Sequence, residues 1–523
     1  MRKTLLLLLL LSFPSFSLML RPGIYTMHDF HVFRQYEFDK CIRAKTFPCR
    51  WAPDAGLGYG EPVFNYYGQL PYWIGEIIHS LGFQIIDTVK LLFILSLVLS
   101  AFTMFIFART YWGSFGGIIS AIFYIYAPYR SVDVWVRGAL PEALSFVLFP
   151  IVLLLVDRKK YLLFSLSLAA LILTHNLSVF MFLPFLAAFW LYKSRDLKFI
   201  PAGLFSLLLS AFYLLPVIFE SRLITLANTT QDYYNYRIHF TTLRELFVSR
   251  FWGYGASLWA QKFLSVSAGH LHWIVPLIII GIIVTRKFKE ASTNFLLFFA
   301  LGVLALFLTH GKSSPIWNYL QPMKFIQFPW RFLSISSLFL SLSSGAIVNL
   351  IPKNYSKIAS IALVSLVILI NFSFFRPDIW RSITDKEQFS GPLWDEQRSS
   401  ALPDFWPQSA PSLPTKFAPA TPTIRIGNGY SKLLDTGVYK ILVEPEYAKI
   451  SFPVVYFPNW TAIIDGREIP VFPSGNLGLV TARIPKGDHL VNLQFKDTLP
   501  RILGNLISAT ALLGIVCKKL ISS

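Results

Sequence analysis

Residues 91–108 read LLFILSLVLSAFTMFIFA, an unbroken apolar run that ends at Arg109. A helix of this length rises about 27 Å, close to the ~30 Å thickness of a bilayer's hydrocarbon core. Runs of the same character recur along the chain, and together they predict about twelve transmembrane helices. The other runs are 4–20, 114–128, 139–156, 161–174, 177–192, 199–219, 271–285, 293–309, 332–351, 358–375 and 501–517.

The overall composition indicates the same class of protein. The 523 residues are 54% hydrophobic and only 14% charged, and the mean hydropathy is +0.53. Soluble domains carry about a quarter charged residues, and disordered, coiled-coil and collagen-like chains also differ from this composition. We therefore expect a mainly α, polytopic membrane protein.

The net charge of +19 could indicate a nucleic-acid partner, so the positions of the basic residues decide its meaning. Lys and Arg gather at the two ends and in alternate short loops, where acidic residues are few. The positive-inside rule makes these segments cytoplasmic and the protein a multi-pass component of the cell membrane with both termini in the cytoplasm. The net charge is therefore explained without a nucleic-acid partner. The basic segments contain Arg2, Lys3, Arg109, Arg158, Lys159, Lys160, Lys193, Arg195, Lys198, Arg286, Lys287, Lys289, Lys353, Lys357, Lys518 and Lys519.

The first apolar run also resembles a secretory signal peptide. We favour a retained helix, because no small-x-small tripeptide closes the run and Phe13, Pro14 and Phe16 interrupt it. On either interpretation the segment that follows is exported.

The opposite side of the membrane then receives the long segments 21–90, 220–270, 310–331 and 376–500. Cys41 and Cys49 lie eight residues apart in the first of these. An oxidising compartment would permit a disulfide there, and two unpaired thiols are the alternative. Cys517, at the cytoplasmic end of the last helix, is expected to be inert.

The C-terminal part of the chain changes character. Residues 1–375 form the transmembrane domain, 376–424 read as a Pro- and Ser-rich linker, 425–500 as an extracytoplasmic β-sandwich, and 501–523 as a final helix with a cytoplasmic tail. Short alternating runs predict the strands.

Turn and breaker residues add detail to the sandwich. Pro453 should confine its strand to an edge. Asp465-Gly466 predicts a hairpin turn, and 485–489, with Gly487, predicts another.

None of the apolar runs has a Lys, Arg, Asp or Glu near its middle. Ion-coupled transporters place such groups near the bilayer midplane, so this pattern argues against that class. Polar residues gather instead at the outer helix ends, which predicts a site at the outer membrane surface. They are Asp29, Asp133, Arg137, Glu142, His175, Glu220, His310 and Arg331.

The first candidate cluster follows the first helix and contains His28, Asp29, His31 and Arg34. A carboxylate there can act as a general base, or it can bind a divalent cation together with His28. An interfacial amphipathic helix over 30–45 is the structural alternative.

Two further clusters lie at outer helix ends. Arg137 and Glu142 belong to a short hairpin and could simply form an ion pair. Trp330 and Arg331 precede the tenth helix. Arg binds phosphate oxygens bidentately and a Trp face can stack on a sugar, although anchoring at the membrane interface explains both residues equally well.

These motifs together resemble a bacterial membrane-protein family, labelled "6-pyruvoyl-tetrahydropterin synthase-related" membrane domain, which is similar to the GT-C glycosyltransferases and to YfhO-like enzymes. The resemblance covers most of the chain. It rests on Arg-Trp-x-Pro-Asp at 50–54, Gly-Tyr-Gly-x-Pro at 58–62, Arg-Gly-Ala-x-x-Glu at 137–142, Gln-Phe-Pro-Trp-Arg at 327–331 and Pro-Asn-Trp…Asp-Gly…Gly-Asp-His at 458–489.

The resemblance implies an integral membrane glycosyltransferase with a polyprenyl-phosphate sugar donor, a cell-envelope glycan, lipid or protein acceptor on the outer face, and Asp29 as the catalytic acidic residue of the first outer loop, which acts as a base. Many members have an acidic pair where this chain has His28 beside Asp29. The residues expected to bind the substrate are His28, His31, Arg34, Arg137, Glu142, Trp330 and Arg331. No cofactor is certain, though a divalent cation could bind at Asp29 and His28. A non-enzymatic flippase or export factor for lipid-linked glycans and a degenerate GT-C scaffold are the alternatives.

Overall fold

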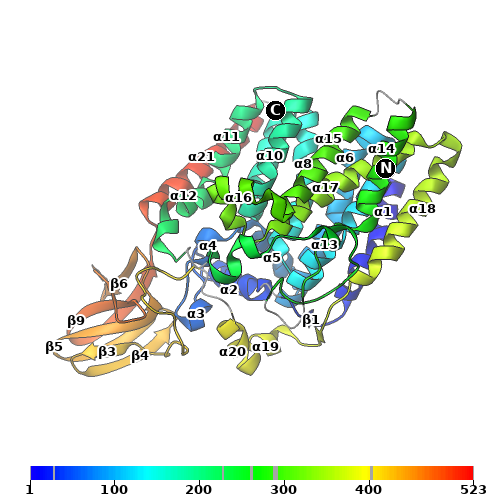
Figure 1. Cartoon of the computed structure of the whole chain (residues 1–523). Helices are drawn as coiled ribbons and strands as arrows, with labels where there is room; N and C mark the ends of the chain where they lie inside the picture. The colour runs from blue at the N-terminus through cyan, green and yellow to red at the C-terminus, as the bar shows by residue number, and fades with distance from the viewer. Residues whose placement is uncertain are drawn as a thin grey trace. The chain divides into compact units, whose positions relative to one another are not determined.

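A computed structural model describes residues 2–27, 30–225, 229–258, 263–286, 292–400 and 405–521. The chain is mainly helical, with an antiparallel β-sheet near its C-terminus (Figure 1). It divides into two compact units. The first, called the helical unit here, contains Met1–Gln35, Gly68–Ser206 and Thr230–Asp385; the second, the mixed unit, contains Tyr36–Tyr67, Leu207–Thr229 and Lys386–Ser523. The four-part division drawn from the sequence stays a prediction.

Seven described helices are long and apolar enough to cross a membrane, or eight if one bent pair counts as a single span, in place of the twelve expected. The protein is a multi-pass membrane protein on this evidence, while its orientation stays a prediction. The seven are Arg2–Leu20, Ile85–Ile125, Leu140–Asp157, Asn176–Lys193, Pro329–Leu350, Lys353–Phe374 and Leu499–Cys517, and the bent pair is Phe199–Leu209 with Ala211–Leu223.

The difference in number has a simple cause. All of the apolar runs are helical, but Tyr161–Thr174, His270–Thr285 and Thr293–Thr309 are shorter than 18 residues, and the bent pair turns by 76° at its break. Apolar composition alone therefore overestimates the number of full spans.

The helix α6, Ile85–Ile125, accounts for two of the expected runs and is broken at Gly113, where φ is 68° and ψ is −173°. A Cβ atom on Gly117 would lie only 3.0 Å from the Phe105 side chain. In a continuous helix these residues would be about 18 Å apart along the axis. The chain therefore reverses at Gly113, and the two halves of α6 form an antiparallel hairpin.

Burial separates the inner helices from the outer ones in the helical unit. The span Pro329–Leu350 is 94% buried, and its helix α17, Leu333–Ser344, packs against α6, α8 (Leu140–Asp157), α14 (His270–Arg286) and α15 (Ser292–Thr309). The span Lys353–Phe374 is only 22% buried, and Ile358, Ile361 and Leu369 on it are exposed. Exposed apolar rows of this kind suit contact with lipid.

The remaining helices of the described chain are shorter or peripheral. They are α1 Arg2–Phe16, α2 His31–Arg43, α3 Ala55–Gly58, α4 Val63–Tyr66, α5 Leu70–Ser80, α7 Pro128–Ser131, α9 Tyr161–Thr174, α10 Asn176–Lys193, α11 Phe199–Leu209, α12 Ala211–Glu220, α13 Leu243–Phe247, α16 Ser314–Tyr319, α18 Lys353–Asn371, α19 Asp385–Gln388, α20 Gly391–Ser400 and α21 Leu499–Ile521. A two-residue pair, β1 Ile24–Tyr25 with β2 Trp380–Arg381, joins distant parts of the helical unit.

The β domain of the mixed unit is one seven-stranded antiparallel sheet in the order β3-β5-β9-β6-β7, with β4 beside β5 and β8 beside β9. An antiparallel β domain is thus confirmed, although its strands form one sheet rather than two. The strands are β3 Thr423–Ile426, β4 Gly429–Asp435, β5 Val438–Val455, β6 Trp460–Ile464, β7 Arg467–Ile469, β8 Phe472–Ser474 and β9 Leu479–Phe495.

The two long strands β5 and β9 carry the core of this sheet. Their register shifts between Val443 and Tyr447 and again between Ser451 and Val455. The core combines inward side chains from both halves of each strand: Tyr439, Ile441, Val443, Ala448, Ile450, Phe452, Val480, Ala482, Ile484, Val491 and Leu493.

One of the three turn and breaker predictions was wrong, and a second holds in part. Pro453 lies in β5 beyond Ser451, the last residue that pairs with β3, and at a register shift between β5 and β9, so the ladder needs no N–H from it. Gly487 lies within β9, paired with Val443, and does not end the strand. The Asp465-Gly466 hairpin between β6 and β7 is confirmed, with φ of 50° and 83°.

Helix α2 is buried rather than interfacial. Val32, Phe33 and Phe38 are at most 3% exposed. Cys41, near the end of α2, forms a disulfide with Cys49, with 5.8 Å between their Cα atoms. Of the two alternatives that the sequence left open, a disulfide or two unpaired thiols, the structure has the disulfide. Cys517 is unpaired and exposed.

Candidate functional site

The candidate site of the helical unit is built on the hairpin between α6 and α8. The chain passes through α7 and a π-helical turn, Val132–Arg137, and Gly138 then takes the left-handed conformation with φ of 64°. A Cβ atom at Gly138 would lie 2.6 Å from that of Met27, so only glycine fits. All residues from 126 to 140 are buried. π-helical turns of this kind are frequent at functional sites.

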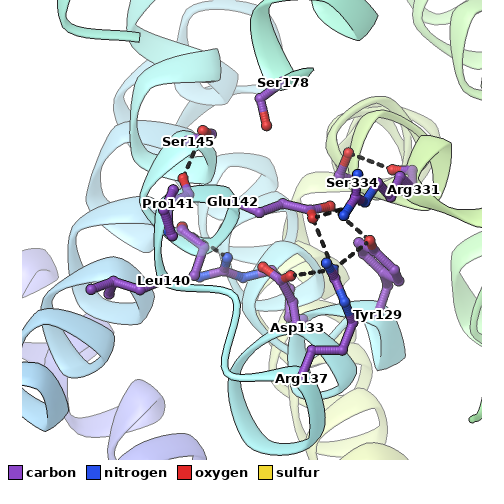
Figure 2. Close-up of polar contacts among 12 residues, drawn as sticks. Tyr129, Asp133, Arg137, Leu140, Pro141, Glu142, Ser145, Ser178, Arg331 and Ser334 are labelled. Atoms are coloured by element: carbon purple, nitrogen blue, oxygen red, sulfur yellow. Dashed lines mark hydrogen bonds and ion pairs between the residues drawn. The ribbon is translucent and has the colours of Figure 1, made fainter. Parts of the chain in front are cut away.

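This hairpin brings two carboxylates onto one guanidinium. Arg137 Nη1 lies 3.0 Å from Asp133 Oδ1 and 2.8 Å from Glu142 Oε2, as Figure 2 shows. The Tyr129 hydroxyl donates to Glu142 Oε1 over 2.7 Å. Asp133 and Glu142 are at most 1% exposed and Arg137 is 9% exposed. The ion pair between Arg137 and Glu142 therefore exists and extends into a buried network.

Arg331 approaches the same carboxylate from another helix. Its Nε lies 3.9 Å from Glu142 Oε2 (Figure 2). Its Nη1 donates to the Ile326 carbonyl over 3.0 Å. Glu142 thus lies between two arginines that are 194 residues apart in the chain. We call Asp133, Arg137, Glu142 and Arg331 the charge cluster.

Trp330 supports the charge cluster with its ring. The Arg137 guanidinium lies 5.0 Å from the Trp330 ring centroid, and Phe328 stacks on the same ring at 4.8 Å. Trp330 is 3% exposed. In this arrangement Trp330 packs within the protein, so it is neither an exposed interfacial anchor nor an open platform for a sugar.

His31 connects α2 to the start of α8. Its Nε2 accepts a hydrogen bond from the Leu140 N–H over 3.1 Å, and its Nδ1 lies 2.9 Å from the Tyr72 hydroxyl. Because Nε2 accepts, the proton is on Nδ1 and the ring is neutral. Arg34 is part-buried and lies one turn further along α2, on the same face as His31.

His28 and Asp29 lie outside the described residues. Their predicted roles as cation ligands, and that of Asp29 as the catalytic base, stay predictions. Within the described ranges, no group of three or more His, Cys, Asp and Glu side chains could hold a metal ion.

A histidine from the second long loop lies near Arg331. His239 packs against the Phe328 ring at 4.7 Å, and the Arg331 guanidinium lies 5.1 Å from that ring. The His239 Nδ1 lies 2.8 Å from Ser257 Oγ. Burial, with a smaller contribution from the charge of Arg331, lowers the pKa of His239. His239 is therefore neutral at pH 7.

A third arginine lies beneath the hairpin. Arg130 is fully buried and donates to the carbonyls of Ala143 and Ser96, each over 3.1 Å. Burial lowers its pKa to about 10, so it stays protonated at neutral pH. Arg130 thus contacts backbone carbonyls, whereas Arg137 and Arg331 contact Glu142.

The structure brings together most of the predicted site residues. Arg137, Glu142, Trp330 and Arg331 form one group, and His31 touches the same hairpin through Leu140. The sequence marked Asp133 among the polar residues at outer helix ends but assigned no site role to Tyr129, Tyr72 or His239. Tyr129 precedes Arg137 by eight residues, which helical spacing could have indicated; no local signal marks the other two.

Comparison with known proteins finds similarity only to solved structures. A structure of the arabinofuranosyltransferase AftD from Mycobacteria matches 73% of this chain with 16% sequence identity and a TM-score of 0.44. A mutant form of the same enzyme matches 73% with 16% identity and a TM-score of 0.46. The matches span 27% and 28% of those longer chains. No family model and no curated protein sequence matches, so the family indicated by the motifs stays a prediction.

Proposed function

We propose that this protein is an integral membrane glycosyltransferase that moves a sugar from a polyprenyl-phosphate donor to a cell-envelope glycan, lipid or protein acceptor on the outer face. The observation that carries the proposal is the buried contact of Arg137 and Arg331 with Glu142, at the ends of apolar helices. Charged groups inside a membrane protein are costly, and those that persist usually serve function.

The two arginines on Glu142 suit an anionic substrate. Arg137 and Arg331 approach the same carboxylate from different parts of the chain. A guanidinium offers paired N–H donors that match two phosphate oxygens. A lipid-linked sugar phosphate combines an apolar chain with such an anion, and it would use both the lipid-facing helices and the arginines.

The proposed reaction divides its roles among these groups. Asp29 accepts the proton of the acceptor hydroxyl as that oxygen bonds to the sugar's anomeric carbon. The bond from this carbon to the phosphate oxygen breaks, and Arg331 with Arg137 stabilises the departing phosphate. Glu142 and Tyr129 orient Arg137, and His31 holds the start of α8.

The disulfide supports an exported site. Cys41 lies on the same helix as His31, and its bond to Cys49 forms readily in an oxidising compartment. This favours an extracytoplasmic α2, on the side where the basic-loop pattern also puts it.

A purified-protein assay tests the proposal. The protein in nanodiscs is given synthetic polyprenyl-phosphate sugars and extracts of envelope acceptors, and release of polyprenyl phosphate is followed. We expect release with at least one donor. Arg331→Lys should weaken the use of that donor, because an ammonium does not reproduce the paired guanidinium donors. Lipid movement across the bilayer without release would favour a flippase.

A further inference from the structure

The β-sheet of the mixed unit has a second face, opposite its apolar core. Side chains alternate along a strand, so Lys449, between the core residues Ala448 and Ile450, points away from the core. Lys449 pairs in register with Arg483 on β9, between the core residues Ala482 and Ile484. Paired residues share a face. Lys449 and Arg483 therefore project together from this second face.

A hollow lies beside Arg483 at the edge of the sheet, between β7 and β8. A hollow of about 490 Å³ is lined by Ile469, Pro470, Phe472 and Arg483. The Lys449 Nζ lies 5.1 Å from the Phe472 ring centroid, which puts the ammonium at the same place. This volume falls within the usual range for small-molecule sites.

The cations of this face have no acidic partner in the part of the chain that the structure describes. Arg425 on β3 reaches the face too, where its Nε lies 3.4 Å from Ser451 Oγ. Among the described residues, no carboxylate lies within ion-pair distance of Arg425, Lys449 or Arg483. Three carboxylates of the sheet are engaged elsewhere, in the pairs Asp465–His489, Asp488–Lys440 and Glu468–Lys496.

We propose that this hollow binds an anionic oligosaccharide, with a sugar ring against Phe472 and a carboxylate or phosphate group on Arg483 and Lys449. A simple anion would leave the apolar side of the hollow unused, and a neutral sugar would leave the cations unused. Guanidinium and ammonium groups bind such anions by charge-assisted hydrogen bonds. The site is separate from the charge cluster and does not depend on glycosyl transfer there.

The experiment measures binding to the full-length protein in nanodiscs of zwitterionic lipid. The probes are a galacturonic acid hexamer, a glycerol phosphate oligomer and maltohexaose as the neutral control. We expect saturable binding of at least one anionic probe and at least tenfold weaker binding of maltohexaose. The two anionic probes tell a carboxylate from a phosphate ligand.

Variants separate a built site from general charge attraction. Lys449→Gln with Arg483→Gln should weaken the anionic probe at least tenfold, and Phe472→Ala should weaken it although all three cations remain. Phe472→Leu replaces Phe472→Ala if the latter lowers the thermal midpoint. Arg467→Gln, exposed on β7 of the same sheet, is the matched control and should bind as the wild type does. Asp29→Asn should also bind normally.

Three results would overturn the proposal. These are equal affinity for maltohexaose, an Arg467→Gln effect as large as that of Arg483→Gln, or tighter binding to phosphatidylglycerol vesicles than to both anionic oligomers. Loss of transfer in Asp29→Asn with intact probe binding would leave this proposal standing, so its failure and that of the glycosyltransferase proposal are distinguishable.

Discussion

The Glu142 carboxylate accepts a 2.8 Å hydrogen bond from Arg137, five residues earlier, across the left-handed turn at Gly138. Both side chains are buried. This pair fixes the geometry of the charge cluster, since Asp133, Tyr129 and Arg331 all approach one of its two members. Its removal should therefore affect both stability and the proposed chemistry.

Glu142→Gln should destabilise the protein strongly. The substitution keeps the size of the side chain but leaves Arg137 and Arg331 with less compensating charge, and loss of one member of a buried ion pair costs about 3–5 kcal/mol. We expect a clearly lower thermal unfolding midpoint in detergent, measured by intrinsic fluorescence.

The matched control for that substitution is Asp157→Asn, at the other end of α8. Asp157 is 23% exposed and lies 3.6 Å from Lys193. A pair of this kind contributes about 0–1 kcal/mol. If both variants unfold at the same temperature, the charge cluster does not have the structural importance assigned to it.

The disulfide gives a second stability prediction. Cys41→Ser with Cys49→Ser should cost about 2–3 kcal/mol, because the covalent link closes a short loop in the unfolded chain. In the denatured wild type, a maleimide should label only Cys517 until reductant is added. Labelling of Cys41 before reduction would show that the bond is absent.

Much of the helical architecture was predictable because its signal is local. Residues 91–108 form a helix as their composition indicates, and the Asp465-Gly466 turn follows from backbone preferences of two residues. The reversal at Gly113 and the continuation of β9 through Gly487 depend on partners far along the chain. No local pattern specifies those partners, so a turn and a paired strand cannot be told apart at Gly487.

Glu37 should make stability depend on pH. It is fully buried on α2, and burial raises its pKa from 4.5 to about 7 although Lys40 lies 3.1 Å away and opposes the effect. The folded protein thus holds this proton more tightly than the unfolded chain does. The stabilising contribution is complete below about pH 4.5 and is lost as the pH rises through about 7, by roughly 3 kcal/mol in total.

Glu37→Gln isolates that contribution. The difference in unfolding midpoint between wild type and variant should change between pH 5 and 7.5 and then level off. Glu446→Gln, an exposed acid in the sheet, serves as the control and should show no such change. A pH-independent difference for Glu37→Gln would contradict the raised pKa.

The basic-loop pattern predicts opposite sides of the membrane for two positions. Lys353 should be cytoplasmic and Ser409 extracytoplasmic. Reporter fusions at the two positions should give opposite signals. The same signal at both would rule out the predicted orientation.

The candidate site was predictable in its parts and unpredictable in its connections. The sequence indicated Arg137, Glu142, Trp330 and Arg331 because charged and aromatic residues stand out at the ends of apolar runs. Helix packing brings Arg331 to Glu142. It also brings His31 to the Leu140 N–H, 109 positions along the chain, from which His31 accepts a hydrogen bond. The contact of the Arg137 guanidinium with the Trp330 ring is likewise a tertiary feature.

The most direct test of the glycosyltransferase proposal compares lipid-linked and envelope glycans, by mass spectrometry, in cells with the protein, without it, and with Asp29→Asn in its place. The account predicts that one defined sugar disappears from an envelope glycan in the deletion, that its polyprenyl-phosphate donor accumulates, and that Asp29→Asn, expressed at the wild-type level, lowers transfer by roughly 10²- to 10⁴-fold. Identical glycans in all three strains would contradict it.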